Sequence, residues 1–545
     1  MAEHFLQSHQ LYLTPLSPLH LGTGEDYQPT EYTIEDGMMY VFDPSQAVLK
    51  PAQYEELMRV ARSGKILAIQ QYFKKHVVTF KECAYKVVGV STALESEYEG
   101  KLGKIVQNEG NGKNVVNQLT IECTAVNPCS HQAYIPGSAF KGGVRTALLD
   151  SLTRKNLPEQ KPNARQAIHH ENQYLGAFAS DVMRLLKTAD FMPTDKVFTQ
   201  IQYAVNHKKD KIIINGQVQM PKGVTRRCEA IQHGQYRSFQ ASCTMQHLLL
   251  VHQPDIKHPE SKLPKENLLN INELAKAVNE YHQARWKKEN QILEERNLVC
   301  PNWLKQTRQL LDNLKPQLDK GQIMLMRLGK NGGAESKTLT NLAQIKIMQG
   351  KGNGATFEST TKTVWLAAQS ERETHGLLPF GWVLVEINPD EENAKLKQWC
   401  ESYTHLKNVE KANEQLEEQR LKLAQRKQEQ QRWEQEQEAA EEAKKRADAE
   451  QAAILATMLP NERLIVIWQQ KLKDFVFDSR NQQASNDFFQ QFSQALLQAQ
   501  EWGAEIQKNI AEVFAWSKIS KLQPSLFAGK REKEIKALLR QLRGE

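Results

Sequence analysis

Residues 134–152 read YIPGSAFKGGVRTALLDSL, and this stretch predicts a helix that is docked on a sheet. Ser138 follows Pro-Gly at the position of a helix N-cap, and the residues from Ala139 onward suit a helix. The apolar residues recur at spacings of three and four, so they share one face that can pack against a sheet. These residues are Phe140, Val144, Ala147, Leu148 and Leu152.

The first turn of this predicted helix combines two cations with two glycines. Lys141 and Arg145 lie four residues apart, so like charges meet where the helix dipole is already positive. Gly142 and Gly143 each cost roughly 1 kcal/mol in helix propensity. An anion bound at this helix end would explain the combination, because backbone N–H groups and both cations could face it. The alternative is a helix whose exposed end is simply basic.

The composition is that of a soluble protein with two or more domains. The chain has 545 residues, and 71 Lys and Arg residues against 64 Asp and Glu residues give a net charge of +7. This excess favours a polyanionic partner only if the cations are clustered. The N-terminus lacks the basic and apolar regions of a signal peptide, and no later run is long enough to span a bilayer. The sequence therefore predicts a cytoplasmic protein with no membrane partner.

The sequence predicts neither a metal site nor a cofactor. Seven cysteines are scattered without a CxxC pair, which predicts reduced and mostly buried thiols. The histidine pair at 169–170 has no Cys or carboxylate at ligand spacing. A Walker A loop ending at Lys337 would need glycines at two positions that are occupied by Asn331 and Ser336, so an NTPase is excluded.

The first 130 residues read as strands around helices. A short strand at 11–13 enters a loop in which His20, Gly22 and Gly24 would let a backbone approach closely. Further strands are predicted at 32–34 and 38–42, joined as a hairpin by Glu-Asp-Gly, and at 84–90. A helical pattern covers 44–75, and the polar, Gly-rich residues 95–120 read as a mobile loop.

The next stretch contains a predicted hairpin that is basic and aromatic. After a helix at 173–186 and strands at 197–205 and 211–214, residues 228–231 and 235–241 flank His-Gly as a hairpin. Its cations alternate with Tyr236 and Phe239, the mixture that tracks and stacks a single nucleic-acid strand. The alternative is a half-buried hairpin with a solvated basic face. The cations are Arg226, Arg227 and Arg237.

A glycine-rich loop follows a predicted strand at 322–328. Its backbone amides and cations could hold phosphates without hydrolysis. The alternative is a plain mobile surface loop. The residues concerned are Arg327, Lys330, Gly332, Gly333 and Lys337.

These elements predict an α+β fold of ferredoxin type with insertions. The predicted domains are 1–165 and 166–390, the second with a helical insertion at about 265–320. Residues 391–455 are rich in Glu, Gln, Lys, Arg and Ala, and 456–545 read as a helical module. A heptad seam at Val409, Ala412, Leu416 and Leu423 continues with Gln or Arg, so a long solvated helix is favoured over a stable coiled coil.

No residue is assigned to catalysis. The chain contains neither GxSxG nor HExxH. Asp26 could position a metal or a 2′-OH for RNA cleavage, but a solvated loop carboxylate is the simpler interpretation. His20 could act as a general base, although such a residue more often caps a turn or contacts a ligand.

Five motifs together resemble the repeat-associated mysterious proteins (RAMPs) of CRISPR–Cas type III systems. Their order and spacing most resemble the family of the fifth subunit of the type III-A Csm effector complex. The resemblance covers roughly residues 8–390, and its most specific part is IPGSAFKGGVRTAL. The motifs are LSPLHLGTG at 16–24, YIPGSAFKGGVRTALLDSL at 134–152, CEAIQHGQYRSF at 228–239, RLGKNGGAESKTL at 327–339 and LPFGWVLVEI at 378–387.

This resemblance implies two RRM-like (ferredoxin-like) domains packed together, with CRISPR RNA (crRNA) held across them. It also implies a position at the 3′ end of the crRNA, beside the backbone RAMP subunit and other Csm subunits, and a part in crRNA maturation with host nucleases. Residues carried over as crRNA contacts are Ser138, Lys141, Gly142, Gly143 and Arg145, then His20, Gly22 and Gly24, and finally Gly332, Gly333 and Lys337.

The leading hypothesis is thus a non-catalytic crRNA-binding subunit. Two alternatives are an endoribonuclease of the same superfamily, acting on crRNA precursor or target RNA, and an adaptor that recruits partners through residues 390–545. A cut that depends on Asp26 or His20 would favour the enzyme.

Overall fold

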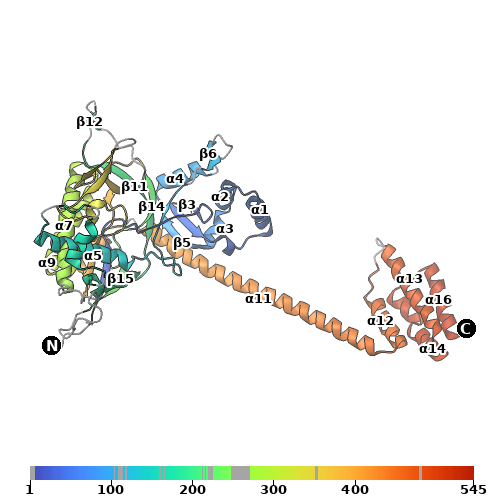
Figure 1. Ribbon diagram of the computed structural model, residues 1–545. Helices are drawn as coiled ribbons and strands as arrows, with labels where there is room; N and C mark the ends of the chain where they lie inside the picture. Colours follow the sequence, from blue (N-terminus) through green and yellow to red (C-terminus); the bar gives the residue numbers. More distant parts are fainter. Residues whose placement is uncertain are drawn as a thin grey trace. The chain divides into compact units, whose positions relative to one another are not determined.

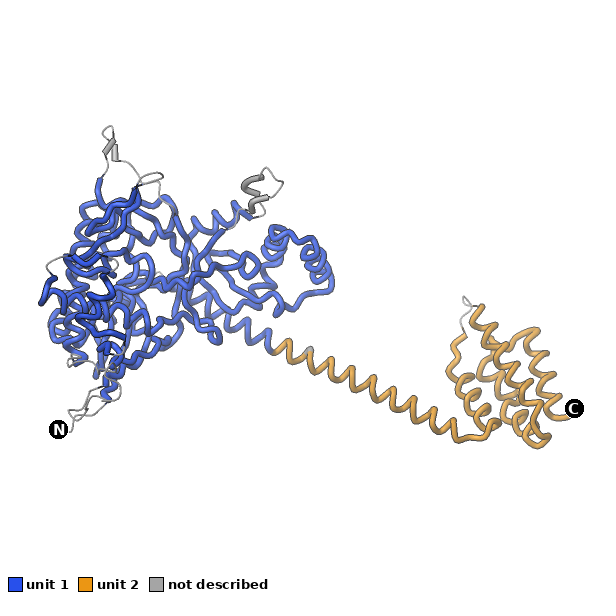
Figure 2. The backbone as a smooth tube through the Cα atoms, viewed as in Figure 1, with its two compact units in different colours: residues 1–424 blue, residues 425–545 orange. Residues whose placement is uncertain are grey.

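The structure, a computed structural model, has an α+β fold. It divides into two compact units, residues 1–424 and 425–545 (Figure 2). Predictions for parts of 95–120, 211–214 and 265–320 lie outside the described residues. For 105–108, 114–116, 213–214 and 217–218 only the backbone is described. The structure describes 6–102, 105–108, 114–116, 119–158, 161–163, 166–178, 180–211, 213–214, 217–218, 225–246, 270–349, 354–404, 406–477 and 482–545.

The first unit contains a six-stranded sheet that is built around the N-terminal strand β1 (Leu6–Pro15). β1 pairs antiparallel with β15 (Phe239–Gln246) on one side and with β21 (Trp382–Ile387) on the other. Leu11 and Leu13 of β1 are fully buried in the core. The sheet is completed by β9 (Leu186–Thr188) and β10 (Met192–Pro193), which pair with β15, and by β16 (Ile323–Arg327), which pairs with β21.

A second sheet, of nine strands, follows the order β2-β8-β14-β11-β5-β4-β3, with β19 pairing with β11 and β20 pairing with β19. Its predicted hairpin is confirmed: β3 and β4 pair through a turn in which Asp36 and Gly37 have φ of 55° and 71°, the left-handed region that such tight turns require. The strands are β2 (Gly22–Asp26), β3 (Tyr32–Glu35), β4 (Met38–Phe42), β5 (Ala84–Gly89), β8 (Glu122–Thr124), β11 (Thr199–Lys208), β14 (Arg226–Ile231), β19 (Thr363–Ala368) and β20 (Leu378–Pro379).

The basic hairpin predicted at 228–241 is wrong. β14 belongs to the nine-stranded sheet and β15 to the six-stranded sheet, so the chain crosses between sheets where a turn was predicted. At this crossing Gly234 has a φ of 82°, and a Cβ there would lie 3.1 Å from Tyr403 Cβ. Both sheets combine strands from the two sides of residue 165, so the strands are not divided at the predicted domain boundary. The number of domains in this region stays a prediction.

Three predictions need correction because helices begin or end at other residues than expected. The predicted loop 95–120 begins inside helix α4 (Thr92–Lys101), which Ser91 caps by accepting from the Leu94 N–H. The helix predicted at 173–186 is instead α6 (Ala167–Leu175), which stops at Gly176, where φ is 91°. A short 3₁₀ turn, η2 (Val182–Leu185), then follows. The pattern at 44–75 is split into η1 (Pro44–Gln46), α1 (Pro51–Arg62) and α2 (Ile66–Lys75), followed by α3 (Val77–Glu82).

Helix α5 (Gly137–Lys155) is the helix predicted at the centre of the chain. It begins at Gly137, the N-cap position is Pro136, and no side chain caps it, so Ser138 is not the cap. Four of its five predicted core residues are buried in the main core, and Leu152 packs against that core. α5 lies beside α7 in the first unit (Figure 1).

The remaining elements of the first unit are helices and small hairpins. The helical insertion consists of α7 (Ile271–Glu295), α8 (Pro301–Asn313) and α9 (Lys315–Lys320). A 3₁₀ turn, η3 (Ala334–Lys337), lies in the glycine-rich loop, and α10 (Ala394–Glu401) follows β21. Two-stranded hairpins pair β6 (Ile105–Asn108) with β7 (Asn114–Val116), β12 (Ile213–Ile214) with β13 (Gln217–Val218), and β17 (Ile345–Met348) with β18 (Ala355–Glu358). All seven cysteines are free.

Helix α11 (Lys407–Thr457) has 51 residues and starts in the first unit. Its predicted seam residues are all buried, but they pack on the first unit's own cluster around Phe42, Phe73 and Phe80. Val409 lies directly over Gly89, where a Cβ would come within 2.7 Å of its Cγ2. The seam therefore serves an intramolecular contact, and the helix after Leu423 is exposed along most of its length.

The second unit is helical after Pro460, with a hydrophobic core of its own. Trp468, Phe492, Phe514 and Phe527 lie in this core. The helices are α12 (Pro460–Asp474), α13 (Gln482–Gln498), α14 (Ala504–Val513), α15 (Trp516–Leu522) and α16 (Lys530–Arg543), with η4 (Ala499–Glu501). Within the described residues, none of the helices has the length and apolar character required to cross a membrane.

Candidate nucleic-acid interface

A groove of ≈ 800 Å³ lies where three motifs that are far apart in the sequence meet. One wall is the beginning of α5, the second is the beginning of β2, and the third is the glycine-rich loop after β16. The predicted site residues that line the groove are Gly22, Ser138, Gly142, Gly143, Arg327, Lys330 and Lys337.

The side of α5 that lines the groove carries only small side chains. A Cβ at Gly143 would lie 3.0 Å from Met326 Cε, so this glycine lets α5 pack closely on β16. A Cβ at Gly142 would meet no atom of the described residues within 4 Å, so packing among them does not require this glycine. Because a mid-helix glycine costs about 1 kcal/mol, the open backbone at Gly142 is better explained by the approach of a ligand.

Lys141 and Arg145 lie on a different side of α5 and do not line the groove. Lys141 Nζ donates to the Leu186 carbonyl at 2.7 Å, and Arg145 forms ion pairs with Asp181 at 2.6 Å and Glu171 at 3.3 Å. Burial, together with the charge of a neighbouring lysine, lowers the pKa of Lys141. In this structure these two side chains tie α5 to α6, to the start of η2 and to the first residue of β9. Their predicted role as crRNA contacts stays a prediction.

The N-terminus of α5 is already occupied by a carboxylate of the chain. The Gly137 N–H donates to Asp190 Oδ1 at 2.7 Å. A Cβ at Gly137 would lie 2.5 Å from the Ala189 carbonyl oxygen, so this glycine serves backbone packing. Sequence reasoning missed Asp190 because no local pattern links it to a helix 53 residues earlier.

His20 is fully buried. This burial argues against the predicted contact between its side chain and a ligand. Its Nδ1 lies 2.7 Å from the Glu229 carbonyl oxygen and its Nε2 lies 3.3 Å from Glu122 Oε2. Burial lowers its pKa below the usual value, which favours the neutral ring. The exposed part of this loop is at Gly22, where a Cβ would lie 3.1 Å from Lys330 Cδ, and at Gly24.

Glu122 on β8 pairs with two of the predicted cations, and sequence reasoning missed it. Its carboxylate accepts from Lys330 Nζ at 2.7 Å and lies 3.6 Å from Arg226 Nη1. Burial would raise the pKa of Glu122, but the Lys330 hydrogen bond and the nearby positive charges outweigh it, so the pKa is lowered. The residue could not be found from a pattern, because Arg226 comes near it through the pairing of β8 with β14 and Lys330 lies 208 residues later, in the glycine-rich loop.

The three cations of the predicted basic hairpin have different partners and different exposure. Arg227 makes an ion pair with Glu97 through two nitrogens, and Arg237 bonds Glu386 at 2.9 and 3.0 Å. Both guanidinium groups are mostly buried and engaged in ion pairs within the protein. Their role as RNA contacts stays a prediction. Phe239 is buried in the core.

Arg226 remains accessible. Its side chain is 46% exposed, and its guanidinium carbon lies 5.4 Å from the ring centroid of the half-buried Trp365. Through Glu122 this pair is connected to Lys330, which lines the groove. An arginine stacked on an aromatic ring is a suitable platform for a nucleobase.

The glycine-rich loop is anchored to the first loop of the chain. The Lys330 N–H donates to the His20 carbonyl at 2.8 Å, and a Cβ at Gly329 would lie 2.4 Å from that same oxygen. Gly333 has a φ of 75°, which favours glycine. Lys337 is exposed, and no described residue pairs with it. Lys330 and Lys337 are thus the predicted loop cations that can face a ligand.

The structure gives no geometric support for catalysis at Asp26. Asp26 is exposed on β2, opposite Glu122 in the strand register. Over the part of the chain that is described, no three His, Cys, Asp or Glu side chains are grouped so that they could hold a metal ion.

The chain is similar to a curated protein and to solved structures. No family model matches the chain. The Csm5 protein of the CRISPR system of Methanocaldococcus jannaschii is 27% identical over 151 residues, which are 26% of this chain and 31% of the relative. The chain thus matches less than a third of that relative's length.

Both solved structures are 16% identical to the chain. One is a chain of the cryo-EM structure of a Csm–crRNA–target RNA ternary complex of a type III-A CRISPR–Cas system, with a TM-score of 0.40, covering 70% of this chain and 100% of that chain. The other is a crystal structure of T. onnurineus Csm5, with a TM-score of 0.36, covering 69% and 99%. The similarity to the M. jannaschii protein confirms the predicted resemblance of this chain to the RAMP subunits of Csm complexes.

Proposed function

We propose that this chain is an RNA-binding subunit of a type III-A CRISPR effector complex and that the groove beside α5 holds the backbone of the crRNA. The observation that carries the proposal is the meeting of Gly22, Gly142 and the lysines of the glycine-rich loop in one groove. The similarity to a Csm5 protein supports membership of such a complex.

The chemistry of the groove favours an extended phosphate backbone. Lys330 and Lys337 supply positive charge, and the open helix backbone at Gly142 allows close approach. Arg226, which lies over Trp365, offers a stacking surface and is connected to Lys330 through Glu122. Cations with a nearby stacking platform are typical of single-strand binding that is driven by phosphates and tolerant of sequence.

Three finer statements belong to the same proposal. The chain caps the 3′ end of the crRNA beside the backbone RAMP subunit, it supports crRNA maturation by host nucleases, and it is not itself a nuclease. The described residues that line the groove are glycines and apolar, hydroxyl-bearing and cationic residues, with no His, Cys, Asp or Glu among them, which suits binding more than acid–base chemistry.

The test measures crRNA binding by the full chain over a series of salt concentrations. Phosphate-driven binding weakens as salt rises, with a slope set by the number of neutralised phosphates. The double variant Lys330→Ala, Lys337→Ala should reduce the slope of log K against log salt by about 1.4, the contribution of two phosphate contacts on a single strand.

The matched control is Lys187→Ala, because Lys187 is exposed but lies outside the groove. It should leave the slope nearly unchanged. A double variant with the wild-type slope would contradict the assignment of the groove. RNA cleavage by the wild type that is lost in Asp26→Ala would contradict a non-catalytic subunit and favour an endoribonuclease.

A further inference from the structure

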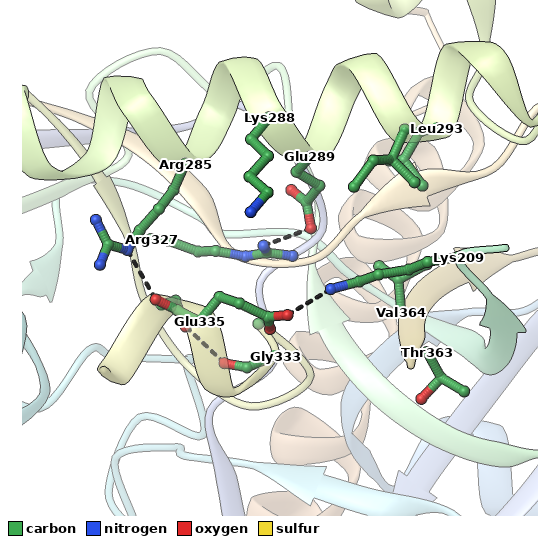
Figure 3. Close-up of a pocket in the computed structure, with 13 residues that line it drawn as sticks. Lys209, Arg285, Lys288, Glu289, Leu293, Arg327, Gly333, Glu335, Thr363 and Val364 are labelled. Carbon is green, nitrogen blue, oxygen red and sulfur yellow. Dashed lines mark hydrogen bonds and ion pairs between the residues drawn. The ribbon is translucent and has the colours of Figure 1, made fainter. Parts of the chain in front are cut away.

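A second, narrower pocket lies on the other side of the glycine-rich loop, between η3 and helix α7 (Figure 3). Its volume is ≈ 60 Å³. One water needs at least about 10–15 Å³ of such space, so the pocket has room for roughly four waters or one tetrahedral oxyanion. Arg327 and Ser336 line both this pocket and the groove, so they form a shared wall.

The charged side chains around this pocket carry an excess of positive charge. The two carboxylates are engaged: Glu335 accepts from Lys209, and Glu289 accepts from Trp382 Nε1 at 2.9 Å. The four cations exceed these two acids by two charges. The cations are Lys209, Arg285, Lys288 and Arg327.

Arg327 has an unused donor in this pocket. Its side chain is only 6% exposed, Nε donates to the Phe380 carbonyl at 2.9 Å, and Nη1 donates to Glu289 at 2.5 Å. Its Nη2 is buried and has no hydrogen-bond partner among the described residues. A buried charged donor without an acceptor is costly, and a bound anion would satisfy it.

Lys288 provides a second available cation. Its side chain extends from α7 toward the Arg327 guanidinium in Figure 3. It is exposed, and no described residue forms an ion pair with it. Arg285, in contrast, already donates to the carbonyls of Glu335 and Thr338 and lies 3.3 Å from the Tyr281 ring centroid, so it fixes the loop on α7.

We propose that this pocket binds a phosphate group, which accepts hydrogen bonds from Arg327 Nη2 and Lys288 Nζ. This phosphate is either the free inorganic ion or a terminal phosphate of RNA. Either one would neutralise the excess charge and hold the glycine-rich loop against α7. The site lies outside the groove, and it can be tested without RNA.

The first experiment titrates inorganic phosphate into the RNA-free full chain by calorimetry at constant ionic strength. Saturable binding is expected in the wild type. Lys288→Ala should weaken it roughly tenfold, the loss expected for one charge-assisted hydrogen bond. Lys287→Ala is the matched control, because Lys287 is the adjacent exposed lysine and does not line the pocket. It should change binding less than about twofold.

Two outcomes would overturn the proposal: no saturable binding to the wild type, or equal weakening in Lys287→Ala and Lys288→Ala. Because Lys288 is exposed, its truncation leaves the core intact. Retained phosphate binding in Lys330→Ala, Lys337→Ala would separate this site from the groove, so either proposal can fail without the other.

The second experiment identifies the source of the phosphate. Two otherwise identical RNAs, one with terminal phosphates and one with terminal hydroxyls, are titrated into the wild type and Lys288→Ala. A preference for the phosphorylated RNA that disappears in Lys288→Ala assigns the site to RNA ends. Equal binding of both RNAs, with phosphate binding retained in their presence, assigns it to the free ion.

Discussion

Glu122 holds two of the accessible cations, Lys330 at 2.7 Å and Arg226 at 3.6 Å. Their charge is thus partly neutralised before any ligand arrives. A phosphate of bound RNA has to compete with this carboxylate for the same donors. Glu122 consequently limits affinity, and it also keeps both side chains in position at the groove.

Removal of this carboxylate gives a prediction for a single residue. Glu122→Gln keeps the shape of the side chain and releases Lys330 and Arg226, so crRNA should bind roughly three- to tenfold more tightly at low salt. The gain should shrink as salt rises, because it is electrostatic. Titrations at two salt concentrations measure it.

Glu25→Gln is the control, because it removes the same charge from the exposed strand β2. An equal gain in both variants would attribute the effect to net charge and contradict a specific role of Glu122.

The sequence located some residues of the groove where the cause was local. Gly142 and Gly143 were singled out because two glycines weaken a helix, and both line the groove. Lys141 and Arg145 were correctly placed together on one side of the helix. Their acceptors, Leu186 and Asp181, lie within 173–186, which was predicted as one helix although α6 ends at Leu175. The partners of a charge depend on tertiary contacts, which spacing alone does not reveal.

At the scale of elements, α5 combines a packing role with an open backbone. Its apolar side is buried in the core, and its start is fixed on the backbone of Ala189. Among the three glycines of α5, only Gly142 has open space, within the described residues, where a Cβ would stand. Stability and ligand approach therefore make opposite demands on this one position.

Gly142→Ala tests this conflict. Alanine fits without a clash and should raise the free energy of unfolding by about 0.5–1 kcal/mol. The same methyl group stands in the groove, so crRNA affinity should fall. Chemical denaturation and RNA titration measure the two effects on one variant.

A fall in both stability and affinity, or a rise in stability with unchanged affinity, would contradict the role given to Gly142. Ser151→Ala, on α5 but outside the groove, is the control and should leave RNA affinity unchanged.

Strand pairing shows why some elements could be predicted and others could not. The β3–β4 hairpin was predicted because its turn residues impose a local geometry. β14 and β15 have the same short spacing and alternation, yet they enter different sheets. Their partners, β11 and β1, lie elsewhere in the chain, so the pattern of β14 and β15 alone could not distinguish a turn from a crossing between sheets.

At the scale of the whole molecule, the two compact units have separate hydrophobic cores. The groove is built entirely from residues of the first unit. A chain that ends at Ala424 keeps the seam residues of α11 in their cluster. It should therefore bind crRNA with the affinity and salt slope of the full chain.

Side-by-side salt titrations of the two chains test this expectation, with circular dichroism as the check on folding. Weaker binding by a folded truncated chain would contradict the assignment of RNA binding to the first unit alone. Loss of partner subunits without loss of RNA binding would instead support an adaptor role for residues 425–545.

Strand β1 lies between β15 and β21, so its two neighbours are more than 220 and 360 residues away along the chain. Ribosomes add about 5–20 residues per second. Once made, β1 must therefore wait roughly 20–75 s before the last of its neighbours is synthesised. The first neighbour, β15, is made roughly 10–45 s after β1, and until then the apolar residues of β1 have neither of their sheet neighbours to pair with. The order of synthesis thus leaves this strand exposed to aggregation, or to binding by chaperones, until its neighbours have been made.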